Sequence, residues 1–123
     1  MDRTKDITMQ VQEQIQEVEI QLSESKAMIE DGKAIDRLLK NRDFKRIVMS
    51  GYFESEVKRL GLLISDPNWQ SPEQQQELIS SLKGVGNLRH YLNTKKEFAR
   101  MAANSLSDYE EALDELREEE AEA

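Results

Sequence analysis

Residues 65–72 read SDPNWQSP, and this stretch decides how the rest of the chain folds. It holds both prolines of the sequence among turn-forming residues, so no helix is expected to continue through it. It also specifies where the next helix begins, because Ser71 is suited to cap a helix, Pro72 to its first position, and Gln74 to a capping box with Ser71. On both sides apolar residues recur at helical spacing and no alternation is long enough for a strand, which predicts an all-α fold.

The C-terminal side of this loop contains no further proline, so a long helix is predicted from Pro72 onward. A helix of about 45 residues would be about 68 Å long at 1.5 Å per residue. Two stretches could break it, the glycine pair Gly84 and Gly86 and the polar residues 93–96.

The N-terminal side of the loop also has helix signals. Asn41 resembles an N-cap, with Asp43 early in the following helix, where its negative charge favours the helix dipole. Gly51 and Gly61 lie inside that helical pattern, and each costs about 1 kcal/mol relative to alanine. Close approach of another helix would compensate for that cost, although Gly51 could instead mark a bend.

The first segment, residues 4–30, carries a seam whose positions are alternately four and three residues apart: Val11, Ile15, Val18, Leu22, Ser25 and Ile29. This is the heptad spacing of a coiled coil, with a polar residue at Ser25. Such a helix is too weakly apolar to be stable alone and needs a partner along the seam. That partner is either the same chain or a second chain in an intermolecular coiled coil. The pair Asp31 and Gly32 is predicted to end or kink the helix.

The predicted architecture is an extended helical hairpin or bundle. Its parts are an N-terminal coiled-coil-like helix (1–31), a basic central helical region (32–66), a Pro/Trp loop (67–71) and a long C-terminal helix (72–123). Apolar residues make up 37% and charged residues 34% of the 123 residues. A monomer of this composition would have a thin core, which favours helices that share their apolar faces with partners.

The acidic end of the chain (residues 108–123) accounts for its whole net charge of −8. It contains nine acidic residues and one basic residue, whereas the other 107 residues contain sixteen of each. Apolar residues keep helical spacing through it, so we expect a helix with an acidic face that includes Glu110, Asp114 and Glu118. Negative charge at a helix C-terminus opposes the helix dipole, so this end should fray unless a basic partner binds it.

A basic segment (residues 33–46) has a local net charge of +4. Its six basic residues are opposed by Asp36 and Asp43 alone: Lys33, Arg37, Lys40, Arg42, Lys45 and Arg46. The segment is either a solvated helix face or a docking surface for an acidic partner. Nucleic acid is not favoured as that partner, because the segment has a single aromatic residue, Phe44, rather than aromatic residues interleaved with its cations for base stacking. The acidic end of a neighbouring copy is an equally natural partner, which predicts a head-to-tail homo-oligomer.

Catalytic motifs are not found in the sequence, so we expect no enzyme, cofactor or metal site. Cysteine is absent, and His90 is the one histidine, which excludes a standard zinc site. Trp69 lies in the proline-bounded loop, where it would cap the helix junction or bind a partner. No apolar run approaches the roughly twenty residues that span a bilayer, and no signal-peptide core follows the N-terminus. We therefore expect synthesis in the cytoplasm of the cell and no membrane partner.

A series of short motifs resembles small proteins of tailed bacteriophages that are encoded among head and packaging genes. Residues 38–47 read LLKNRDFKRI, followed by GYF at 51–53, RL at 59–60 before the proline loop, and EEALDE at 110–115. The resemblance covers roughly residues 38–120 and leaves out the N-terminal seam. It implies a virion or assembly component of the host cytoplasm or the particle, with scaffold, capsid-associated and connector roles all open, and it carries over no catalytic residues.

The expected function is therefore a non-enzymatic helical interaction protein that self-associates and contacts other virion or assembly proteins. One alternative is an acidic inhibitor that occupies the nucleic-acid site of a host protein as a DNA mimic. Another is a small DNA-packaging adaptor that uses the basic segment, which salt-dependent binding to duplex DNA would identify.

Overall fold

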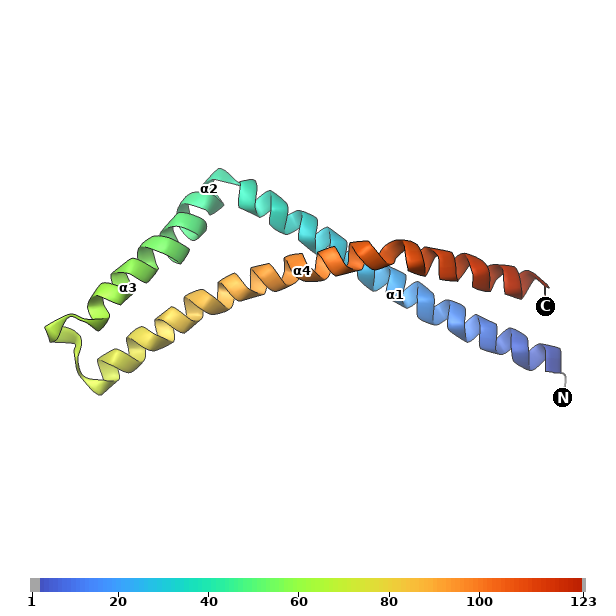
Figure 1. The fold of residues 1–123 in the computed structure, drawn as a ribbon, viewed down its shortest axis with the longest axis horizontal. Coiled ribbons are helices and arrows are strands. Elements are labelled where there is room, and N and C mark those ends of the chain that lie inside the picture. Colours follow the sequence, from blue (N-terminus) through green and yellow to red (C-terminus); the bar gives the residue numbers. More distant parts are fainter. Residues whose placement is uncertain (1–2, 123) are drawn as a thin grey trace. The chain divides into compact units, whose positions relative to one another are not determined.

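The structure is a computed structural model that describes residues 3–122. Those residues are all-α and contain no strand, in agreement with the predicted fold class and with its N-terminal helix and long C-terminal helix. In chain order the elements are α1 (Arg3–Lys40), α2 (Arg42–Phe44), η1 (Lys45–Glu56), α3 (Val57–Ile64), η2 (Pro67–Trp69) and α4 (Pro72–Glu122) (Figure 1).

The start of α4 confirms the predicted capping box. The Ser71 hydroxyl accepts a hydrogen bond from the Gln74 amide at 3.1 Å, and the Gln74 side chain accepts one from the Ser71 amide at 3.3 Å. From Pro72 the helix runs for 51 residues without interruption. Neither predicted weak point ends it, because a glycine weakens a helix by only about 1 kcal/mol and the flanking turns carry strong helix formers.

Two glutamine side chains hold the loop between α3 and α4. The Gln70 side-chain amide donates to the carbonyls of Ile64 at 2.9 Å and Asp66 at 2.7 Å. The Gln75 amide donates to the carbonyls of Ile64 at 3.1 Å and Trp69 at 2.7 Å. The bonds to the Ile64 carbonyl satisfy a group that the end of α3 leaves without a helical partner, so the turn is fixed by named contacts as well as by its prolines.

Asn41 caps the short helix α2, as its sequence position predicts. Its side-chain oxygen accepts a hydrogen bond from the Phe44 amide at 2.9 Å, and α1 ends immediately before it at Lys40. The twelve residues after α2 form the π-helix η1, where the sequence pattern predicts an ordinary α-helix. Within η1 the Ser55 hydroxyl also donates a hydrogen bond to the Ser50 carbonyl, five residues earlier, at 3.1 Å.

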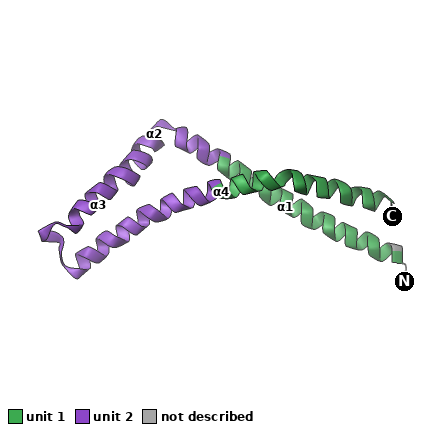
Figure 2. Cartoon of the chain, viewed as in Figure 1, with its two compact units in different colours: residues 1–32, 97–123 green, residues 33–96 purple. Residues whose placement is uncertain are grey.

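The chain divides into two compact units, coloured separately in Figure 2. Unit 1 consists of residues 1–32 and 97–123, and unit 2 of residues 33–96. Both long helices, α1 and α4, contribute residues to each unit.

The core of unit 1 is the predicted N-terminal seam packed against α4 of the same chain. Val11, Ile15 and Leu22 form a buried cluster with Leu113. Four half-buried residues pack around it, one from α1 and three from α4: Val18, Leu106, Tyr109 and Leu116. The partner that the seam requires is thus present within the chain, and a second copy would have to use another surface.

Gly32 does not end the helix, so of the two alternatives predicted there, an end or a kink, the helix end was wrong. Helix α1 passes through Gly32 to Lys40. A Cβ atom at residue 32 would overlap the Cβ of Ala99 on α4, so the glycine permits the two helices to approach closely.

The close approach expected at Gly51 and Gly61 is not found there. A Cβ at Gly61 would meet nothing within 4 Å. A Cβ at Gly51 would lie 3.1 Å from the Arg46 carbonyl of its own π turn. The cost of these glycines is therefore not offset by a neighbouring helix.

Unit 2 has its own core, contributed by all of its longer elements. Its buried residues are Ile35, Phe53, Leu60, Leu78 and Val85. The Arg89 guanidinium lies 5.6 Å from the centre of the Phe53 ring, in a cation–π contact. Tyr52 packs edge-on against the same ring, with the ring centres 5.9 Å apart.

Candidate interaction surfaces

The basic segment belongs to unit 2 and is exposed along its length. All six basic side chains that define it are exposed: Lys33, Arg37 and Lys40 in α1, Arg42 in α2, and Lys45 and Arg46 in η1. Arg37 and Lys40 lie in the last turn of α1, where positive charge also favours the helix dipole. That structural role explains why two of the six positions are basic, but it does not apply to the other four.

The acidic end belongs to unit 1 and is helical through Glu122. Glu110, Asp114 and Glu118 are exposed and spaced four apart, so they lie on one face of α4. The opposite face packs on α1 through Leu113 and its half-buried neighbours. Arg117 forms an ion pair with Glu19 of α1 at 3.4 Å, between two half-exposed side chains. The acidic end is therefore anchored to α1 by its apolar face.

The two folded units differ more in net charge than the acidic end differs from the rest of the sequence. Unit 1 contains five basic and eighteen acidic residues, a net charge of −13. Unit 2 contains twelve basic and seven acidic residues, a net charge of +5. The acidic end contributes only part of the negative charge, because residues 1–32 add eight acidic and three basic residues. The chain thus has one strongly negative unit and one positive unit.

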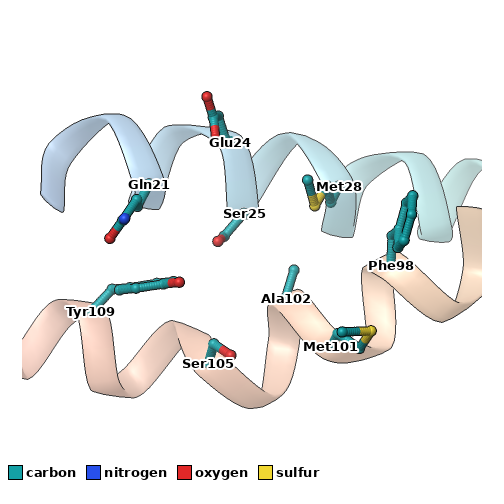
Figure 3. Close-up of a pocket in the computed structure, with 9 residues that line it drawn as sticks. All are labelled: Gln21, Glu24, Ser25, Met28, Phe98, Met101, Ala102, Ser105 and Tyr109. Carbon is teal, nitrogen blue, oxygen red and sulfur yellow. The ribbon is translucent and has the colours of Figure 1, made fainter. Parts of the chain in front are cut away.

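A groove of about 270 Å³ opens between α1 and α4 in unit 1 (Figure 3). Ser25 and Ala102 point toward each other across it, and the Tyr109 ring lies at one end. The large side chains at its rim are exposed, Met28 at 40%, Phe98 at 47% and Met101 at 53%. The groove is thus lined by small side chains in its floor and by exposed apolar side chains at its edge.

A second cavity, of about 220 Å³, lies within unit 2. Its apolar lining comes from Leu39, Met49, Phe53 and Leu92, and its polar lining from Arg89, Asn93 and Lys96. The last three residues recur on one face of α4, at steps of four and three. Arg89 and Phe53 of this lining are already engaged with each other in the cation–π contact.

Trp69 is half-buried at the loop between α3 and α4. It lines a small pocket together with Leu60 and Leu63 of α3 and Leu78 of α4. This position matches the junction-capping role considered for it, because the indole covers apolar side chains where the two helices meet.

Two glutamate–arginine pairs lie on the surface of the described residues. Glu56 and Arg59, and likewise Glu97 and Arg100, form two-pronged ion pairs between side chains three residues apart. In each pair the hydrogen bonds from the arginine lower the pKa of the glutamate. His90 is exposed, and its Nε2 lies 3.5 Å from the Thr94 hydroxyl. Within residues 3–122 no three potential ligands gather in a way that would hold a metal ion.

Comparison with protein-family models, curated proteins and solved structures gave no match to this chain. None of the described helices combines the length and the apolar character that crossing a membrane requires.

Sequence reasoning located the charged surfaces but not the groove of unit 1. The polar position at Ser25 in an otherwise apolar seam was the signal for it. Its floor also depends on Ala102 and Ser105, which oppose Ser25 only in the observed register of α1 and α4.

Proposed function

We propose that this chain is a non-enzymatic helical interaction protein that self-associates head to tail and serves in the assembly of a tailed-bacteriophage particle. The observation that carries the proposal is the division of charge between a unit of −13 and a unit of +5. A chain with two oppositely charged surfaces is complementary to a second copy of itself in a head-to-tail arrangement. Such a contact is heterologous and builds rings or filaments.

The exposure of the charged side chains supports this interpretation. The six cations of the basic segment and the three carboxylates spaced along the acidic end are all exposed. Because the seam of α1 already packs on α4, self-association has to use such outward surfaces. The resemblance of residues 38–120 to small head and packaging-cluster proteins supports placing the function in a phage particle.

The test compares the wild type with a triple variant, Glu110→Gln, Asp114→Asn and Glu118→Gln. These changes remove three charges and leave Leu113 in the core, which deletion of the acidic end would not. We expect the wild type to have a higher mass in solution at low salt than the triple variant. Raising the salt from about 0.1 M to 1 M shortens the screening length from about 10 Å to 3 Å and should dissociate the wild type. An equal mass for both proteins at every salt concentration would contradict head-to-tail association.

The phage assignment has a separate test. Particles purified from infected cells should contain the protein, or its assembly intermediates should. Recovery of the protein only as free chains, away from every particle fraction, would contradict the assignment and leave self-association standing.

The charge of unit 1 also favours the second candidate, a DNA mimic that inhibits a host nucleic-acid-binding protein. Negative charge in unit 1 is spread over both of its helical segments, as a mimic requires. Displacement of labelled duplex DNA from a host DNA-binding protein by the wild type, but not by the triple variant, would support this candidate.

The basic segment favours the third candidate, a DNA-packaging adaptor. Four exposed cations beyond those at the end of α1 could contact phosphates. Binding of the purified protein to labelled duplex DNA, with an affinity that falls steeply as salt is added, would support it over head-to-tail association.

A further inference from the structure

We propose that the groove of unit 1 is the docking site for the basic segment of a second copy of this chain, with Ile47, the residue that directly follows that segment, as the apolar side chain that enters the groove. The inference rests on the proposed head-to-tail function and deepens it, because it names the contact at which two copies meet.

The groove exists because small side chains occupy positions that larger ones would fill. Ser25 stands at a seam position where Val11, Ile15 and Leu22 stand elsewhere along α1. Ala102 faces it from α4, with Ser105 close by (Figure 3). The helices remain packed on either side of this point, so the groove has fixed walls.

The rim of the groove has the composition of a protein contact surface. Phe98 and Met101 of α4 and Met28 of α1 are each between 40% and 53% exposed. Aromatic and methionine side chains are enriched at protein interfaces, and methionine adapts its shape to an incoming group. An exposed apolar cluster of this kind around a groove favours an apolar side chain as its occupant.

The surroundings of the groove set the charge of that occupant. Glu24 borders it, with its carboxylate directed away from α4 (Figure 3). Asp108 is exposed and follows Met101 by seven residues, so it lies on the same face of α4. The whole of unit 1 has a net charge of −13. The partner should therefore present an apolar side chain with cations beside it.

Unit 2 of a second copy presents such a side chain. Ile47 is 58% exposed and directly follows Lys45 and Arg46, which are both exposed. Leu62 is more exposed, at 74%, and exposed Lys58 lies one turn before it, but the other nearby cation, Arg59, is held by Glu56 in a two-pronged ion pair. Ile47 directly follows two cations that are outside that ion pair, whereas Leu62 has one, and this difference favours Ile47.

The absence of cysteine makes disulfide mapping a direct test. A Met101→Cys protein mixed with an Ile47→Cys protein under oxidised glutathione should give a disulfide-linked dimer of the two variants. Met101→Cys mixed with Leu62→Cys is the matched control and should give at least tenfold less. Equal or greater linkage through Leu62 would overturn the assignment of Ile47.

Filling the groove from within tests the same contact without crosslinking. Ser25→Leu extends the apolar seam, so the variant should unfold at or above the temperature of the wild type, while its self-association weakens by about tenfold or more. Ser23→Leu, at an exposed position two residues away, is the control and should associate as the wild type does. If Ser25→Leu lowers the unfolding temperature, Ser105→Leu provides the same test from α4.

The outcomes separate this inference from the proposed function. A wild type that associates at low salt, together with a Ser25→Leu variant that associates equally well, would overturn the groove as docking site and leave charge-driven association intact. A wild type that stays monomeric at every salt concentration would overturn both.

Discussion

Units 1 and 2 are built from the same kind of element but are held together by different means. Unit 1 is packed by a repeat, in which apolar side chains alternately four and three residues apart along α1 meet α4. Unit 2 is held by a few deeply buried side chains and by side-chain bonds to the backbone at its helix ends. The repeated seam of unit 1 tolerates one small polar residue, Ser25, and a groove forms at that position. Unit 2 has no such repeat, and each of its contacts joins one particular pair of residues.

The largest expected effect is truncation of Leu60, which is only 3% exposed in unit 2. Leu60→Ala should destabilise the protein by about 2–5 kcal/mol, because a cavity is added to the loss of apolar burial. Leu113→Ala in unit 1, at a site that is 8% exposed within a repeated seam, should cost less. Urea unfolding followed by circular dichroism measures both, and hydrogen exchange locates the loss. A greater loss for Leu113→Ala would contradict the contrast between the units.

The next effect lies at the close contact between α1 and α4. Gly32→Ala should destabilise unit 1 by about 1–3 kcal/mol through overpacking, although alanine is the better helix former. The reciprocal change Ala99→Gly should restore stability. Gly61→Ala is the matched control, because its Cβ meets nothing within 4 Å, and it should stabilise α3 by up to about 1 kcal/mol. Thermal unfolding in which Gly32→Ala behaves like Gly61→Ala would contradict the contact.

A smaller effect is expected at the capping box that begins α4. Ser71→Ala removes the acceptor for the Gln74 amide and should cost about 1 kcal/mol. Hydrogen exchange should quicken in the first turn of α4 and stay unchanged near Leu113 in unit 1. Uniform quickening along all 51 residues of α4 would show that the two units do not respond separately.

The features of the fold and of the candidate site that could be predicted from the sequence are those that depend on neighbouring residues alone. The caps at Asn41 and Ser71 were predicted correctly, since each requires only residues within one turn. Burial at Val11, Ile15 and Leu22 agrees with the seam, although the sequence left its partner open. The exposure of the basic segment matches its hydrophilic composition.

The features that sequence missed depend on register or on an uncommon backbone. From the sequence alone, Gly32 predicts a helix end or kink. The structure shows instead that Ala99 of α4 packs against it. The π-helix η1 had no signal in the sequence, because the apolar residues of IVMSGYF at 47–53 fit ordinary helical spacing as well. The groove requires that Ala102 and Ser105 oppose Ser25, which follows from helix pairing rather than from local spacing.

The smallest expected effect compares two ion pairs of identical spacing, one in each unit. Arg59 in unit 2 and Arg100 in unit 1 lower the pKa of Glu56 and Glu97 through hydrogen bonds. Folding lowers these pKa values, so each pair adds a little stability above the unfolded-state pKa of its carboxyl group. That contribution is lost as the pH falls through the folded-state pKa.

The charges nearest the two carboxyl groups differ, because Lys95 and Lys96 directly precede Glu97, whereas Glu54 lies two residues before Glu56. Nearby positive charge lowers the pKa of a carboxyl group and negative charge raises it, so Glu97 should titrate at a lower pH than Glu56. Carbon-13 NMR titration of the two carboxyl groups measures this difference, and added salt should reduce it. A higher pKa for Glu97 than for Glu56 at low salt would mean that the net charge of the whole unit, −13 for unit 1 and +5 for unit 2, outweighs the charges next to each carboxyl group.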